Sequence, residues 1–284
     1  MLKKRKKVIL LSFILFILFS LSSCESKATF SSINKNNLLI HYIDVGQGDS
    51  ILIQVHGKNM LIDAGTTESA NELVNYLKMQ KINKLDYIIE THPHEDHIGA
   101  MSKIINKFEV GKFYAPKVTS NTKAFDNMIN SLRKKSLKIL ISKAGLTLDL
   151  GSGIKCEILA PNSELYKEVN NYSTVVKITY GDTKFLFEGD AEKLSEDEMI
   201  NRGYDLSCDV LKVGHHGSRT ATSDEFLKKT HPKIAVISCG LNNDYGHPHK
   251  PTLTKLEAIN AKIYRTDKYG TIILESDGTK ISKK

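Results

Sequence analysis

The sequence has few cysteines and no apolar run long enough to cross a membrane as a helix. Only four cysteines occur in 284 residues, none in a C-x-x-C pair, which argues against a disulfide-rich scaffold. Besides Cys24, an odd number remains, so we expect buried free thiols among Cys156, Cys208 and Cys239. The longest apolar stretch, residues 8–21, falls short of the roughly 20 residues that a transmembrane helix needs. A bundle of transmembrane helices is therefore not expected.

The N-terminus has the pattern of a secretory signal instead. Five basic residues at positions 3–7 precede the apolar stretch, and small residues follow it. Leu21-Ser22-Ser23-Cys24 resembles the lipobox of bacterial lipoproteins, in which the cysteine becomes the lipidated first residue. A lipid on Cys24 would hold an exported protein on the outer face of the cell membrane. The alternatives are a plain signal peptide and an uncleaved anchor. The expected organisation is a lipoprotein-type signal peptide at 1–23, a polar tether at 24–37 and one folded domain at 38–284.

The positive charge of the chain is also concentrated at the N-terminus. The formal net charge is +8, but five of the basic residues lie in the signal and no acidic residue precedes Cys24. The chain after residue 23 therefore carries +3. Such a nearly neutral protein lacks the broad positive field of typical nucleic-acid-binding proteins. Any contact with a polyanion must therefore be local to a site.

Apolar runs of strand length alternate with helix-like stretches after residue 37. The expected strands are 39–44, 50–55, 59–63, 86–90, 112–115, 155–159, 174–180, 184–188, 209–213, 234–238, 262–265 and 271–275. The expected helices are 69–78, 99–106, 123–134, 192–201, 224–230 and 252–261. Glycine-containing turns at 46–49 and 180–183 join neighbouring strands as hairpins. The mixture of hairpins and strand–helix units favours a mixed sheet covered by helices, in a single α+β domain.

Histidines and carboxylates gather where the expected strands end. His92, His94, Asp96 and His97 lie within six residues, directly after the apolar run 85–89. In an extended chain side chains two apart point the same way, so His92 and His94 converge on one point. A helix that begins after them turns Asp96 and His97 toward a second point. Imidazole and carboxylate suit Zn, Mn or Fe, so the pattern predicts a dinuclear metal site rather than a chance cluster in a polar loop.

Further ligand-type residues end other strands and turns. They are Asp63, Asp190, His215, His216, His247 and His249. We expect no catalytic role for the remaining histidines, His41, His56 and His231.

Together these motifs resemble the metallo-β-lactamase superfamily, and within it the hydrolase domain of the ComEC competence family. The resemblance covers residues 38–276. It implies a four-layer αββα sandwich and hydrolysis by a metal-bound hydroxide. The phrases that carry it are residues 44–50 (DVGQGDS), 92–97 (HPHEDH), 170–173 (NNYS), 187–190 (FEGD), 213–218 (VGHHGS), 245–248 (YGHP) and 266–271 (TDKYGT).

The resemblance also implies roles for individual residues around two divalent ions, Zn or Mn. His92 and His94 would hold one ion, Asp96 and His97 the other, and Asp190 would bridge them. His215 or His216 would complete the second site, and the other would face the substrate. The remaining expected roles are orientation of a ligand imidazole by Asp63, phosphate contact by Lys212 and Ser218, and direct participation in catalysis by Asp96, His216 and His247.

One feature departs from the family pattern. The superfamily usually supplies a third histidine to the first ion, but the chain has no histidine from Ile98 to Gly189. Asn171 or Ser173 falls about where that ligand is expected. Because an amide or hydroxyl is a weaker donor than imidazole, we predict a loose His92–His94 site that favours Mn or fills only with substrate present. The alternative is a single-metal enzyme at Asp96 and His97.

The sequence thus leads to three hypotheses for function. The first is a surface phosphodiesterase or nuclease that acts on extracellular nucleic acid, including single strands. The second is a phosphodiesterase that cleaves phosphocholine or teichoic acid on the cell wall. The third is a non-catalytic binding lipoprotein on a degenerate hydrolase scaffold. No obligate protein partner is evident from the sequence.

Overall fold

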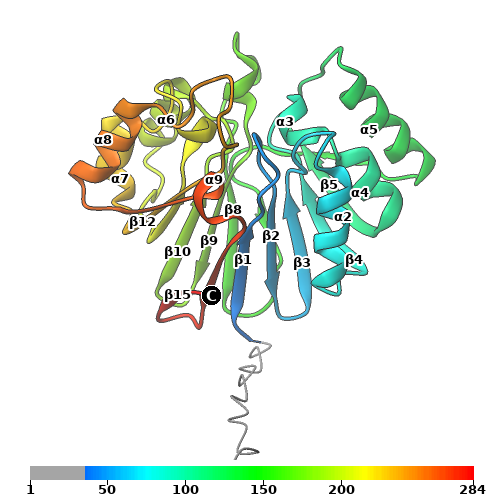
Figure 1. Ribbon diagram of the computed structural model, residues 1–284, viewed down its shortest axis with the longest axis horizontal. Helices are drawn as coiled ribbons and strands as arrows, with labels where there is room; N and C mark the ends of the chain where they lie inside the picture. Colours follow the sequence, from blue (N-terminus) through cyan, green and yellow to red (C-terminus); the bar gives the residue numbers. More distant parts are fainter. Residues whose placement is uncertain (1–35) are drawn as a thin grey trace, which may run out of the picture. The chain divides into compact units, whose positions relative to one another are not determined.

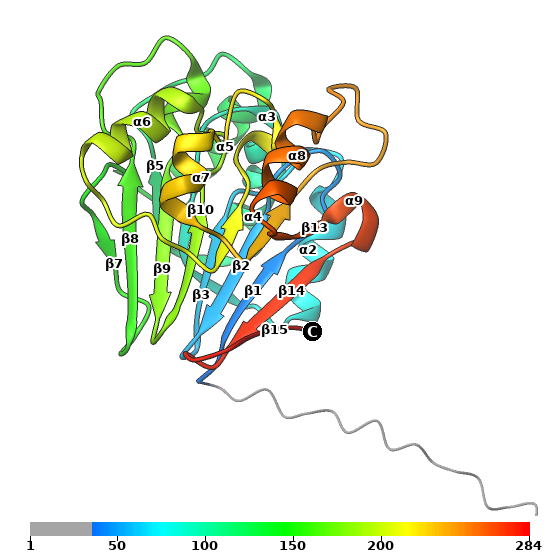
Figure 2. The same cartoon turned by 90° about the vertical axis from the view of Figure 1, so that its left-hand side faces the viewer.

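The computed structural model describes residues 36–284, in which two mixed β-sheets pack face to face between layers of helices (Figure 1, Figure 2). This α+β arrangement confirms the expected four-layer αββα sandwich. The expected signal peptide and the lipidation site Cys24 lie outside the described residues. Within residues 36–284, no helix combines the length and apolarity that a membrane span requires.

The first sheet has eight strands in the order β15-β14-β1-β2-β3-β4-β5-β6. Strands β14, β1, β2 and β3 pair antiparallel, whereas β3, β4, β5 and β6 pair parallel. The bounds are β1 Leu38–Tyr42, β2 Ile51–Val55, β3 Lys58–Ile62, β4 Lys84–Ile89, β5 Glu109–Ala115, β6 Ile139–Ile141, β14 Ile272–Ser276 and β15 Ile281–Lys283.

The second sheet has seven strands in the order β13-β12-β11-β10-β9-β8-β7. Here too a hairpin, β9–β10, leads into parallel pairs that run from β10 to β13. The bounds are β7 Thr147–Leu148, β8 Ile154–Ala160, β9 Val175–Tyr180, β10 Thr183–Phe187, β11 Val210–Lys212, β12 Ile234–Ile237 and β13 Lys262–Arg265. In each sheet the carboxyl ends of the parallel strands share one edge, which is where such folds collect their functional loops.

Helices cover the outer face of each sheet. On the first sheet they are α2 Ala70–Met79, α3 Glu95–Ile98, α4 Met101–Lys107 and α5 Lys123–Lys134. On the second they are α6 Lys193–Asn201, α7 Asp224–Thr230 and α8 Lys250–Ala258. The remaining helical segments are α9 Thr266–Tyr269 and two 3-10 turns, η1 Val169–Tyr172 and η2 Gly214–Gly217.

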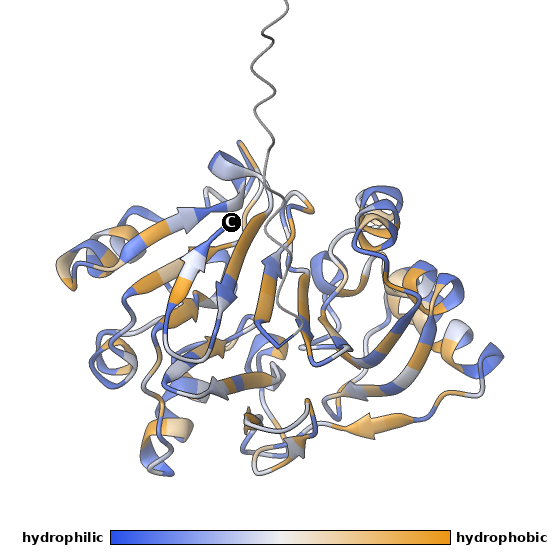
Figure 3. Ribbon diagram, turned by 90° about the horizontal axis from the view of Figure 1, so that it is seen from below, coloured by the Kyte–Doolittle hydropathy of each residue, from blue (hydrophilic) through white to orange (hydrophobic). Residues whose placement is uncertain are grey.

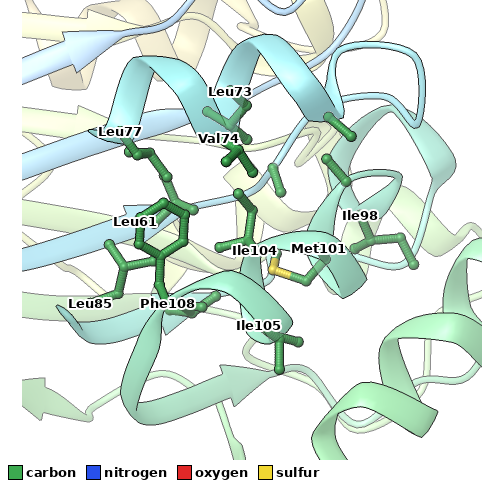
Figure 4. Close-up of a cluster of buried hydrophobic side chains, with 14 of the residues drawn as sticks. Leu61, Leu73, Val74, Leu77, Leu85, Ile98, Met101, Ile104, Ile105 and Phe108 are labelled. Carbon is green, nitrogen blue, oxygen red and sulfur yellow. The ribbon is translucent and has the colours of Figure 1, made fainter. Parts of the chain in front are cut away.

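The core lies in three layers because strand side chains alternate between the two faces of a sheet. On β3 and β4, Leu61 and Leu85 face the helices α2 and α4 (Figure 4), whereas Met60 and Tyr87 face the other sheet. A third cluster packs α6, α7 and α8 onto the second sheet. Figure 3 shows the same division, with apolar segments concentrated in the strands and mixed colours along the helices.

Every expected strand and helix is present, with ends shifted by no more than three residues. The short strands β6, β7 and β15 were not expected, because two or three residues are too few for a period to show. The helix expected at 99–106 is preceded by a separate short helix, α3, which begins at Glu95 within the histidine motif. The expectation of buried free thiols is confirmed, because Cys156, Cys208 and Cys239 are all buried and unpaired.

Candidate metal centre

Four side chains from both sheets meet at the carboxyl ends of the parallel strands. They are Asp96 and His97 on α3, Asp190 after β10, and His216 in η2, and one ligand atom from each lies within 4.8 Å of all the others. His97 Nε2 is 3.3 Å from Asp190 Oδ1, and His216 Nε2 is 3.1 Å from Asp96 Oδ2. The expected second metal position therefore has its ligands already assembled.

The donor atoms of this cluster fit a divalent cation. His97 Nε2 and Asp190 Oδ1 are buried 3.3 Å apart, and neither makes a hydrogen bond of good geometry. Buried polar atoms normally make such bonds, so atoms that lack them call for a further partner such as an ion. Two imidazoles and two carboxylates are a donor set that suits Zn, Mn or Fe.

A second layer of carboxylates orients the two imidazoles. Asp63 is fully buried, and its Oδ2 lies 2.7 Å from His97 Nδ1, which turns Nε2 toward the cluster. Thr91 holds Asp63 through its backbone N–H at 2.8 Å and its hydroxyl at 2.6 Å. On the other side, His216 Nδ1 lies 3.0 Å from the carbonyl of Ser238 and 3.4 Å from Asp49 Oδ1. Asp63 thus lies where the sequence expectation placed it, whereas Asp49 was not expected.

The two adjacent histidines of η2 take different positions. His216 is 1% exposed and belongs to the cluster. His215 has a side chain 22% exposed at the rim, with Nε2 3.7 Å from Asp190 Oδ2 and Nδ1 3.4 Å from Glu192 Oε1. Both residues have positive φ, 48° and 51°, a strained conformation for residues other than glycine. The structure therefore favours His216 as the ligand and leaves His215 facing the pocket.

The His92–His94 pair has a less complete surrounding. His92 Nε2 lies 2.9 Å from His94 Nδ1 and 3.7 Å from Asp190 Oδ2. Among residues 36–284, the groups of three or more clustered ligands include neither His92 nor His94. Ser173 Oγ lies 3.4 Å from His92 Nδ1 and accepts the backbone N–H of Asp190 at 3.1 Å. Of the two residues expected near this position, only Ser173 lies beside the pair.

Asn171 points away from the pair, toward α6. Its Oδ1 accepts the backbone N–H of Ser195 at 3.2 Å. The neighbouring Asn170, which the sequence did not single out, lines the pocket instead and places its amide nitrogen 3.5 Å from His215 Nδ1.

The carboxylates and imidazoles of the cluster compensate one another's charge. Burial alone raises the pKa of Asp190, but His97 and His216 outweigh it and hold this pKa well below its usual range. Burial also lowers the pKa of His216, whereas Asp190 and Asp49 oppose it and raise the pKa to about 10. His92 differs, because burial and then His97 lower its pKa and keep it in the neutral form that binds metals.

A pocket of about 420 Å³ opens above these ligands. His247 contributes a ring whose Nδ1 is buried without a partner and which stacks on Tyr245, with ring centroids 5.6 Å apart. Tyr245 itself is 66% exposed. The complete lining is Gln47, His94, Glu95, Asp96, Thr122, Asn170, Asp190, His215, His216, Tyr245 and His247. Gln47 and Tyr245 lie within the motifs 44–50 and 245–248, so their position in those motifs is the sequence signal for a place in the pocket.

Two expected phosphate contacts require correction. Lys212 is fully buried, and its Nζ lies 2.8 Å from Asp49 Oδ2 and 3.0 Å from the carbonyl of Val213. Ser218 is 4% exposed and pairs its hydroxyl with that of Thr220 at 3.1 Å. Neither side chain lines the pocket, so neither is placed to meet a substrate.

The role of Lys212 is instead to neutralise Asp49 beneath the site. Burial raises the pKa of Asp49, but Lys212 and then His216 outweigh it and lower this pKa to about 2. Asp49 reaches this position because Gly48 allows close approach to α3, since a Cβ on Gly48 would lie 2.3 Å from the carbonyl of Asp96.

We predict that Lys212→Met lowers the free energy of unfolding by about 3–5 kcal/mol, because it leaves the buried charge of Asp49 without its partner. Urea denaturation of the purified protein measures this loss. The double variant Asp49→Asn/Lys212→Met should recover part of it. Lys228→Met, at an exposed position of α7, is the control, and equal stability of the two single variants would contradict the prediction.

Comparisons with known proteins agree with this geometry. The family model described as Metallo-beta-lactamase superfamily matches residues 43–241. ComE operon protein 3 of Bacillus subtilis is 32% identical over 251 residues, which are 82% of this chain and 32% of that protein. Recombination protein 2 of Haemophilus influenzae is 29% identical over 254 residues, or 88% and 30% of the two chains. The chain thus spans about a third of the length of these relatives.

Solved structures show the same fold at low sequence identity. The metallo-beta-lactamase fold protein YhfI of Bacillus subtilis is 14% identical with a TM-score of 0.57, covering 85% of this chain and all of that one. Igni18, a metallo hydrolase from Ignicoccus hospitalis, is 19% identical with a TM-score of 0.54 and the same coverage. Fold, ligand cluster and family match together place this chain in the metallo-beta-lactamase superfamily of metal-dependent hydrolases.

Proposed function

We propose that this hydrolase is a phosphodiesterase that acts on nucleic acid. The observation that carries the proposal is the preassembled cluster of Asp96, His97, Asp190 and His216 at the base of an open pocket. The name of one relative, Recombination protein 2, supports nucleic acid as the substrate. Divalent ions in the pocket would lower the pKa of a coordinated water and offset the negative charge of a phosphodiester.

The residues around the cluster would position the substrate. His247 lines the pocket, where its imidazole can hydrogen-bond a phosphoryl oxygen or the leaving oxygen. The exposed ring of Tyr245, stacked on His247, offers a flat face to a nucleobase. Asp63 and Asp49 would keep the imidazoles of His97 and His216 aimed at the pocket.

We predict that the purified protein hydrolyses bis-p-nitrophenyl phosphate with Mn or Zn, and that Asp63→Asn lowers the rate by about 10–100-fold, the usual effect of losing a carboxylate behind a ligand histidine. Asp190→Ala should abolish turnover. Asp197→Asn, an exposed carboxylate of α6, is the matched control and should leave the rate unchanged.

Substrate assays with single-stranded DNA, phosphocholine esters and teichoic acid would then separate the candidate substrates. Preferential cleavage of the cell-wall compounds would replace nucleic acid as the substrate. The absence of turnover with every substrate under both metals would contradict an enzymatic function and favour the non-catalytic alternative.

We further propose that two ions bind with unequal affinity, tightly at Asp96, His97, Asp190 and His216 and loosely at His92 and His94. Mass spectrometry under native conditions should show one ion at low metal concentration and a second ion at higher concentration. His94→Ala should remove only the second ion, whereas Asp96→Ala should remove the tight one. Two equally tight ions, or one ion at every concentration, would contradict unequal sites.

Finally, we propose that the chain is exported and anchored by a lipid on Cys24, on the basis of its lipobox-like sequence. Cell fractionation should place the protein with membranes on the outer face, accessible to added protease. Cys24→Ser should release it to the soluble fraction. Membrane retention of that variant would instead indicate an uncleaved anchor.

A further inference from the structure

The positive charge of the chain after residue 23 is concentrated in one segment. Residues 110–145, which include α5 and β6, contain eight lysines and arginines and a single acid, Asp126, and therefore carry +7. Because residues 24–284 carry only +3 in total, the remainder is negative by 4. A nearly neutral domain thus has one strongly basic region.

The basic side chains of this segment are available to a partner. Within residues 36–284, some lysines elsewhere form ion pairs, such as Lys58 with Asp149 at 2.7 Å and Lys184 with Asp205 at 3.1 Å. No ion pair in the same range involves the segment's basic residues, and Lys117 and Arg133 are exposed. The cations without ion pairs are Lys112, Lys117, Lys123, Arg133, Lys134, Lys135, Lys138 and Lys143. Their charges are therefore not balanced within the described fold.

The segment also forms a groove of about 610 Å³ between α5, the loop after β5 and the edge strand β6. Lys117 and Arg133 line it together with apolar side chains. Ile139 and Ile141 are 37% and 45% exposed, an unusual position for isoleucine that presents an apolar face to a ligand. Phe125 and Tyr172 add aromatic rings, and Glu90 adds a buried carboxyl oxygen without a hydrogen-bond partner.

This groove continues into the pocket above the metal centre. A hollow of about 570 Å³, lined mainly by residues 119–122, shares Thr119 with the groove and shares His94 and Thr122 with the pocket. The turn η1 also connects them, because Asn170 lines the pocket and Tyr172 lines the groove. In Figure 1, the loop that leads into α5 lies at the same end of the sandwich as α3.

We propose that this groove is a binding track for single-stranded nucleic acid, which extends from the phosphodiester held at the metal centre. The inference rests on the proposed function and adds the substrate form and the residues that bind it. Lys117 and Arg133 would contact phosphates, while bases lie against Phe125, Ile139 and Ile141. Teichoic acid has the phosphates but no flat apolar group, and a duplex conceals its bases. An apolar groove lined by cations therefore fits an unpaired strand best.

Fluorescence anisotropy with a labelled oligothymidylate in EDTA tests binding without hydrolysis. We expect Lys117→Glu/Arg133→Glu to weaken binding by about tenfold or more, and to reduce the salt slope by about 1.4 because two phosphate contacts are lost. Lys228→Glu/Lys229→Glu reverses the same charge on α7 and should have little effect. Ile139→Ser/Ile141→Ser should weaken binding of the oligothymidylate but not of an abasic oligomer of equal length.

Turnover of bis-p-nitrophenyl phosphate separates failure of this inference from failure of the proposed function. Lys117 and Arg133 do not line the metal pocket, so their double variant should cleave this small diester at the wild-type rate. Equal losses from the α7 variant would show a general charge effect and overturn the track. Tighter binding of teichoic acid or of duplex DNA than of the single strand would overturn its assignment to an unpaired strand. If the small diester is not cleaved but the binding pattern holds, the proposed function fails while the track stands.

Discussion

The arrangement of the site depends on the buried carboxylate of Asp190. It lies within 3.7 Å of ring nitrogens from His92, His97, His215 and His216, which come from loops of both sheets. A carboxylate that is 2% exposed is costly to bury without counter-charge. The two sheets must therefore bring their loops together at this edge, and the same requirement that stabilises Asp190 assembles the ligands of a metal. The contacts that pack the two sheets together at this edge are thus the same contacts that form the site.

Charges alternate outward from that carboxylate. Behind His97 lies Asp63, and behind His216 lies Asp49, which is paired in turn with Lys212. Each layer fixes the ring orientation of the layer in front of it, as carboxylates commonly do for ligand histidines. Three residues of the site also have strained backbones, because Asp63, His215 and His216 all have positive φ. The fold holds these residues in strained conformations at the points where their side chains must face the site.

Much of this fold could be predicted from sequence, because period-2 runs and strand-terminal carboxylates and histidines are local signals. The burial of Lys212 against Asp49 could not be predicted. A lysine at the end of an apolar strand has the same sequence pattern whether it is solvated, binds phosphate or is buried in an ion pair. His215 and His216 take different positions because both adopt left-handed backbone conformations. Histidine rarely adopts this conformation, so it could not be predicted from the residue types. Likewise, the sequence could not show that Asn171 faces α6 whereas Ser173 faces His92, because this depends on the backbone direction in and after η1.

The net charge of +3 after residue 23 is distributed unevenly. In the ligand cluster, burial lowers the pKa values of His97 and His216, but the carboxylates outweigh it and raise both, so the charges balance one another. The cluster therefore has no excess positive charge for a phosphodiester until cations bind. The segment 110–145 is positive whether or not metal is bound, because its charges come from lysine and arginine side chains without ion pairs in the described chain. In the function we propose, an anionic polymer is attracted first to α5 and β6, and the centre attracts its phosphates once divalent ions have made the pocket positive. Capture of the polymer would then not require metal, whereas hydrolysis would.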